Sequence, residues 1–67
     1  MYRVIEKGII KFKHGEQTKV AEKLGIDPTS LNRILSGRAN TQYTTAYCIV
    51  KLYDSEKEVL DFFRKID

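Results

Sequence analysis

The stretch DPTSLNRILSG, residues 27–37, combines side chains that suit hydrogen bonding to a polar partner. Its small or flexible polar residues carry donors and acceptors without a carboxylate among them: Thr29, Ser30, Asn32, Arg33 and Ser36. At 100° per residue, the apolar residues of the stretch would face one side of a helix, with Thr29, Arg33 and Ser36 pointing directly away. The pattern therefore indicates recognition through hydrogen bonds.

The same stretch contains signals that begin and end a short helix. Asp27 can cap the helix by accepting a hydrogen bond from a free backbone N–H, and Pro28 fits the first helical position, where an N–H is not needed. Gly37 can adopt the left-handed conformation that terminates a helix. These signals predict a helix over about residues 28–35.

A second short helix precedes it, with only a tight turn between the two. The segment QTKVAEKLGID starts at Gln17, and its helix is expected to stop at Gly25. Ala21 is small, as is required where two helix axes approach closely. Two short helices joined by a tight glycine turn form a helix-turn-helix unit, predicted here over about residues 17–37.

The rest of the chain shows helical periodicity as well. A helix is predicted over residues 2–13, ended by His14 and Gly15, and the apolar segment YTTAYCIVKLY predicts a buried helix over residues 43–53. The first of these has an apolar stripe made by Val4, Ile5, Ile9 and Phe12.

Ser55 is expected to open a last helix, because Glu58 follows at capping-box spacing. Val59, Phe63 and Ile66 would share one face of this helix. The predicted fold class is all-α: a compact bundle of about five short helices, forming one domain over residues 1–67.

Isolated candidates for catalysis do not form a recognisable motif. Cys48, the only cysteine, lies in the most apolar segment and is expected to be a small core residue. His14 is expected to cap the end of a helix. Metal-ligand clusters, glycine-rich phosphate loops, carboxylate pairs and nucleophile–base motifs are absent from the sequence. We therefore predict no enzyme activity, no metal, no cofactor and no small-molecule ligand.

The distribution of charge favours a polyanionic partner. The net charge is +3, and residues 1–38 hold eight Lys/Arg against four Asp/Glu, while residues 39–67 hold four against five. No apolar run approaches the roughly 18 residues that a membrane span requires, and no signal-peptide pattern is visible. A soluble cytoplasmic protein is expected.

The segment QTKVAEKLGIDPTSLNRILSG resembles the helix-turn-helix of the Cro and repressor proteins of temperate phages, and of the wider XRE family of lambda-repressor-like bacterial regulators. The resemblance is specific over about residues 17–38, and it implies a protein associated with the nucleoid of a bacterium or a phage-infected cell. It rests on eight positions at fixed spacing: Gln17, Val20, Ala21, Leu24, Gly25, Ile26, Leu31 and Ile34.

The resemblance implies that residues 28–35 form a recognition helix in the major groove of double-stranded DNA. Gln17 matches a glutamine that bonds a phosphate and braces the recognition helix. Pro28 and Thr29 match the first base-contacting pair, and Arg33 matches a base-reading position one turn later. The loop that holds the sugar-phosphate backbone in the family corresponds to Arg38, Asn40 and Thr41.

The chemistry of individual residues modifies these expectations. Pro28 can offer only an apolar contact, for instance to a thymine methyl group. The Arg33 guanidinium suits bidentate bonding to guanine O6 and N7, whereas Asn32 suits either adenine or a phosphate. The candidate DNA-binding residues are thus Gln17, Pro28, Thr29, Ser30, Asn32, Arg33, Ser36, Arg38, Asn40 and Thr41.

The loop RANTQ after Gly37 is less basic than is usual in the family. Phosphate contacts there would therefore supply less of the affinity for DNA. Four lysines elsewhere could provide the missing charge, and the sequence does not choose between them: Lys7, Lys11, Lys13 and Lys19.

The last segment carries more apolar surface than one helix face needs, which favours self-association. Phe62, Phe63 and Ile66 are the candidate residues of a homodimer interface, and a dimer would read an operator built as an inverted repeat. The predicted function is sequence-specific transcriptional regulation, as a repressor that occupies an operator. The alternative is a protein-interaction module on the same scaffold, such as an antitoxin or an adaptor to another DNA-bound protein.

Overall fold

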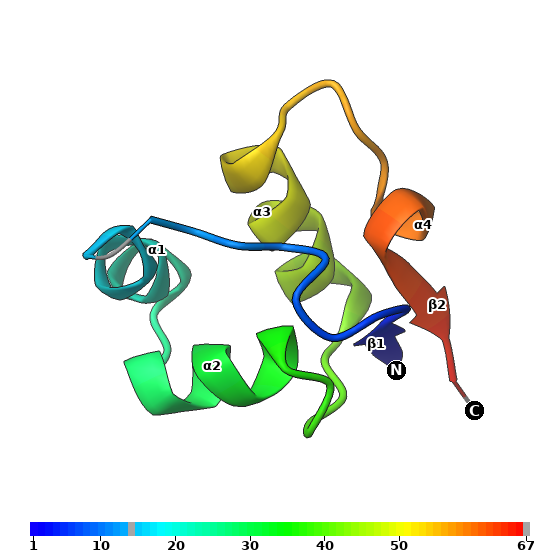
Figure 1. Ribbon diagram of the computed structural model, residues 1–67, viewed down its shortest axis with the longest axis horizontal. Helices are drawn as coiled ribbons and strands as arrows, with labels where there is room; N and C mark the ends of the chain where they lie inside the picture. The colour runs from blue at the N-terminus through cyan, green and yellow to red at the C-terminus, as the bar shows by residue number, and fades with distance from the viewer. Residues whose placement is uncertain (14, 67) are drawn as a thin grey trace.

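A computed structural model describes residues 1–13 and 15–66, so the expected capping role of His14 lies outside the described residues. Within this part of the chain there are four helices and one two-stranded sheet (Figure 1). In chain order the elements are β1 (Tyr2–Val4), α1 (Glu16–Leu24), α2 (Pro28–Leu35), α3 (Tyr43–Tyr53), α4 (Val59–Phe62) and β2 (Phe63–Lys65). The expected all-α bundle of five helices is thus wrong in two places, at the two ends of the chain.

The helix-turn-helix forms as predicted, from α1 and α2. Gly25 ends α1 in the left-handed conformation, with φ +71°. The Asp27 side chain accepts a hydrogen bond from the backbone N–H of Thr29 at 2.9 Å, and Pro28 occupies the first position of α2. Ala21 is fully buried, as expected for the place where the two helices approach.

The helix predicted over residues 2–13 is not formed. β1 pairs antiparallel with β2, so that Val4 lies opposite Phe63. The backbone N–H and C=O of Tyr2 also bond to Thr41, at 2.6 and 2.8 Å. Gly8 has φ +83°, a left-handed conformation that a continuous helix cannot contain. Pairing with distant segments therefore overrides the helical spacing of the apolar residues.

The C-terminal helix is shorter than predicted and begins later. Ser55 lies in a loop, and the capping box is formed one turn further on, by Glu58 and Asp61. The backbone N–H of Glu58 donates to the Asp61 carboxylate at 2.8 Å. After one turn the chain becomes extended at Phe63 and enters β2.

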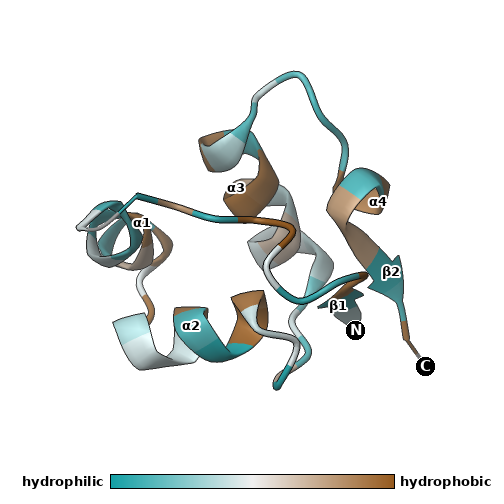
Figure 2. Ribbon diagram, in the orientation of Figure 1, coloured by the Kyte–Doolittle hydropathy of each residue, from teal (hydrophilic) through white to brown (hydrophobic). Residues whose placement is uncertain are grey.

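Helix α3 lies between the helix-turn-helix and the sheet, and its buried residues form the centre of the core (Figures 1 and 2). Ala46, Ile49 and Val50 have no exposed surface. The helix is not buried on all sides, however, and Cys48 is exposed rather than part of the core. Four large side chains of the helix remain at least 38% exposed: Tyr43, Tyr47, Leu52 and Tyr53.

In the described part of the chain, no helix combines the length and the apolar character needed to cross a membrane.

Candidate nucleic-acid interface

Helix α2 separates its side chains into a buried and a solvent-facing set. Leu31 is fully buried, and Ile34 and Leu35 are 7% and 6% exposed. The polar residues predicted to point outward all have solvent-accessible side chains, Ser36 only partly: Thr29, Ser30, Asn32, Arg33 and Ser36. The sequence spacing thus predicted the two faces of this helix correctly.

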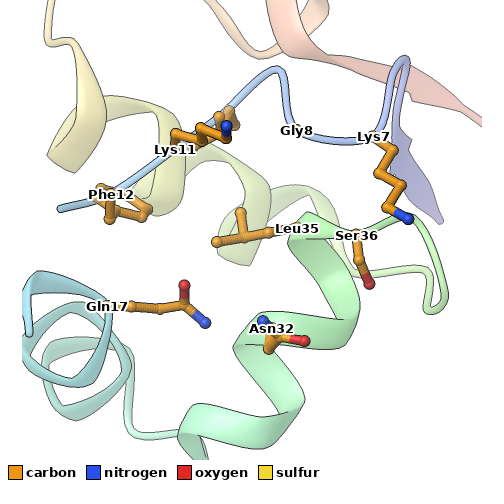
Figure 3. A pocket seen from close by; sticks show the side chains of 9 residues that line it. Lys7, Gly8, Lys11, Phe12, Gln17, Asn32, Leu35 and Ser36 are labelled. Atoms are coloured by element: carbon orange, nitrogen blue, oxygen red, sulfur yellow. The ribbon is translucent and has the colours of Figure 1, made fainter. Parts of the chain in front are cut away.

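One flank of α2 faces an open pocket of about 200 Å³. Gln17 at the start of α1 and Asn32 on α2 extend toward each other across it, and Ser36 lies further along the same side (Figure 3). The opposite wall is the segment that links β1 to α1, which contributes Lys7 and Lys11. The Asn32 side-chain amide therefore lies on the flank of α2 that faces Gln17, and not on the side of the helix that points directly away from the core.

The other flank of α2 borders a separate depression of about 240 Å³. Ser30 and Arg33 line it from the helix, and Ala39 and Asn40 line it from the following loop. The backbone carbonyl of Arg33 receives the N–H groups of that loop, at 2.9 Å from Arg38 and 3.2 Å from Ala39. These two hydrogen bonds to Arg33 hold the loop against the end of α2.

The loop after α2 does not present all three of the residues expected to contact a backbone. Arg38 is exposed. Asn40 is partly buried, and its side-chain oxygen accepts a hydrogen bond from Arg3 Nε at 2.8 Å. Thr41 is only 6% exposed, and both of its backbone groups bond to Tyr2. Thr41 is therefore part of the packing that holds β1, and the structure removes it from the candidate interface.

A family model described as helix-turn-helix matches residues 14–60, more than two thirds of the chain. The chain belongs to the XRE helix-turn-helix family, the family of the Cro and lambda repressor type. It is thus a DNA-binding regulator of the XRE type, and α1 and α2 are its DNA-binding motif. Among the curated proteins and the solved structures, no significant match was found.

Residues predicted for self-association in this XRE-family protein have different environments. Phe63 is 1% exposed and belongs to the core, so its side chain has no surface to offer. Phe62 and Ile66 are partly buried, and the Phe62 ring packs edge-on against Tyr53 with 5.6 Å between centroids. Leu60, on the single turn of α4, is 69% exposed. The free apolar surface of this region is therefore centred on Leu60.

Sequence reasoning missed Arg3 at the XRE-family site, and it named Lys7 and Lys11 only as two of four lysines between which the sequence did not choose. Arg3 reaches the loop after α2 because β1 lies beside that loop, and the lysines line the pocket because residues 5–13 form an irregular segment of turns and loop rather than a helix. The β-branched pair Val4–Ile5 and the glycine at position 8 were the available signals against a helix. In residues 1–13 and 15–66, no group of three or more His, Cys, Asp or Glu is placed to hold a metal ion.

Proposed function

We propose that the protein is a sequence-specific repressor that acts by occupying an operator in double-stranded DNA, with α2 in the major groove. The observation that carries the proposal is the exposed face of α2, which offers hydrogen-bond donors and acceptors and no carboxylate. Base edges in the major groove present a distinct pattern of donors and acceptors for each base pair, which such a face can read. Occupancy alone is sufficient for repression, because a bound protein excludes other proteins from the same DNA.

Within this proposal the first turn of α2 approaches the bases most closely. Pro28 and Thr29 begin the helix and are exposed, so Pro28 would supply an apolar contact and Thr29 a hydroxyl. Arg33 follows one turn later, and its guanidinium has no hydrogen-bond or ion-pair partner among the described residues. A free guanidinium on the exposed face of α2 is suited to hydrogen bonding with the O6 and N7 atoms of guanine.

We also propose that two copies bind an inverted repeat. One helix of eight residues contacts only a few base pairs, and a two-fold dimer doubles the length of the site. The exposed apolar side chain of Leu60 is the available contact on the C-terminal side of the fold. Half-site centres about 10 bp apart, one turn of DNA, would place both recognition helices on one face of the duplex.

Selection of bound sequences from random duplexes tests the function directly. The expected result is a defined motif with inverted symmetry. The Arg33→Ala variant should then bind that motif more weakly by about 1–3 kcal/mol and should lose preference at one base pair per half-site. Recovery of no motif would contradict sequence-specific binding, and a loss of affinity equal for all sequences would make Arg33 a phosphate contact.

A further inference from the structure

The pocket between α2 and the N-terminal segment is lined by side-chain hydrogen-bond donors as well as by the apolar side chains of Ile10, Phe12 and Leu35. Lys7 and Lys11 come from the segment that leads from β1 to α1, and Gln17, Asn32 and Ser36 come from the helix-turn-helix. In Figure 3, Gln17 and Asn32 point toward each other, Lys7 extends toward Ser36, and Lys11 lies on the other side of Gly8, above Leu35 in this view. The pocket thus joins the recognition helix to a segment that is not part of the helix-turn-helix.

The charges at this pocket are of one sign. No carboxylate lines it, although Glu6 and Glu16 are close in sequence to the lysines. The Glu16 carboxylate accepts a hydrogen bond from the backbone N–H of Lys13 at 3.0 Å. Across residues 1–13 and 15–66, neither Lys7 nor Lys11 forms an ion pair. Two free ammonium groups beside amide and hydroxyl donors make a site suited to an oxyanion.

The position of the pocket indicates which oxyanion would bind there. Asn32 and Ser36 belong both to the pocket wall and to the recognition helix. When α2 lies in the major groove, the flank of the helix faces the phosphates that border the groove. The loop on the opposite side of α2 offers little charge, since Arg38 is its only basic residue.

From this arrangement we infer that the pocket receives one phosphate of the DNA backbone in each half-site, held by Lys7 and Lys11. This inference rests on the proposed function. It assigns to the irregular segment of residues 5–13 the positive charge that the loop after α2 lacks. The contact is independent of base sequence, so it raises affinity and fixes the position of the protein on the duplex without changing which bases are preferred.

The test compares two double variants that remove equal charge. Lys7→Gln with Lys11→Gln empties the pocket of its ammonium groups. Lys23→Gln with Lys57→Gln is the matched control, because neither of these lysines lines the pocket. Binding to the selected operator is measured between 50 and 200 mM salt. Loss of one phosphate contact in each half-site lowers the salt slope by about 0.9 per bound chain, so by about 1.8 for two chains on the operator, which amounts to about 12-fold in affinity over this range.

A second arm locates the phosphate on the DNA. Each backbone phosphate of the operator is replaced in turn by a neutral methylphosphonate. At one position per half-site, the replacement should weaken DNA binding by the wild-type protein and by the control variant. It should leave the affinity of the Lys7→Gln/Lys11→Gln variant unchanged. The Lys7→Arg/Lys11→Arg variant, which retains both charges, should keep the wild-type salt slope.

The outcomes separate this inference from the proposed function. If the wild-type protein binds its operator and depends on Arg33, but the pocket variant matches the control, the phosphate assignment is wrong and the function stands. If the wild-type protein selects no DNA sequence, both fail. If inorganic phosphate binds saturably near Lys7 and Lys11 by NMR at constant ionic strength, but no methylphosphonate position depends on these lysines, the pocket is a site for a free anion and the assignment is overturned.

Discussion

Replacement of Phe63 should unfold the protein rather than dissociate a dimer. The ring is 1% exposed, and Phe63 is paired with Val4 across the sheet. Leu60 is the matched control, since it lies three residues earlier and is 69% exposed. Removal of all residues from Val59 onward is a less informative change, because it deletes β2 and two core side chains together with the exposed leucine.

The expected loss follows from the burial of the ring. An aromatic side chain buries roughly 150–250 Å², which at about 25 cal/mol per Å² corresponds to about 4–6 kcal/mol. Measured Phe→Ala substitutions in cores cost about 3–5 kcal/mol. A domain of this size has a total stability of about 3–10 kcal/mol, so Phe63→Ala should leave the chain largely unfolded. Leu60→Ala removes little buried surface and should change the stability by about 0.5 kcal/mol or less.

Urea unfolding followed by circular dichroism measures both variants. Each titration is performed at two protein concentrations tenfold apart, because the unfolding midpoint of a dimer rises with concentration and that of a monomer does not. Phe63→Leu, which keeps part of the buried volume, should be intermediate between wild type and Phe63→Ala. A Phe63→Ala protein as stable as wild type, or one rescued simply by raising its concentration, would refute the placement of Phe63 in the core.

Three further predictions concern the motif, the backbone contact and the association surface. Ala21→Leu should destabilise the fold by about 1–3 kcal/mol, since a larger side chain overpacks the contact of α1 with α2; an unchanged urea midpoint would show that this site has room. Arg38→Ala should weaken binding to all DNA sequences about equally and lower the salt slope by about one, and a slope identical to wild type would exclude a phosphate contact. Leu60→Glu should weaken operator binding without altering base preference, and footprinting with sedimentation on an operator duplex should show two chains for wild type; a single chain on an asymmetric footprint would contradict dimer binding.

The elements that could be predicted from the sequence are those defined by local signals. The bounds of α2 follow from Asp27, Pro28 and the glycine at position 37, all within one short stretch, and the end of α1 follows from Gly25. The two ends of the chain could not be predicted in this way. Residues 2–4 and 63–65 become strands only by pairing with each other, a contact that apolar spacing within either segment does not encode.

The residues of the candidate site show the same difference between features set by local signals and features set by long-range contacts. The exposed face of α2, including Thr29 and Arg33, follows from helical geometry alone, and the structure agrees with it. Thr41 was expected at the interface because of its place in the family pattern, yet its contact with Tyr2 buries it. Lys7 and Lys11 could not be chosen over other lysines from sequence, because their position depends on the irregular, non-helical path of residues 5–13.

The pairing of β1 with β2 also has a consequence for the order of folding. Contacts within the helix-turn-helix are local and close short loops, whereas Val4 meets Phe63 across almost the whole chain. Closing a long loop delays the contact it makes. We therefore expect the local contacts of the helix-turn-helix to form first during folding, although short helices are marginal on their own. The arrangement of α2 becomes stable only when β1 pairs with β2 and Phe63 enters the core, so the recognition helix and the segment that carries Lys7 and Lys11 reach their final positions in the same late step.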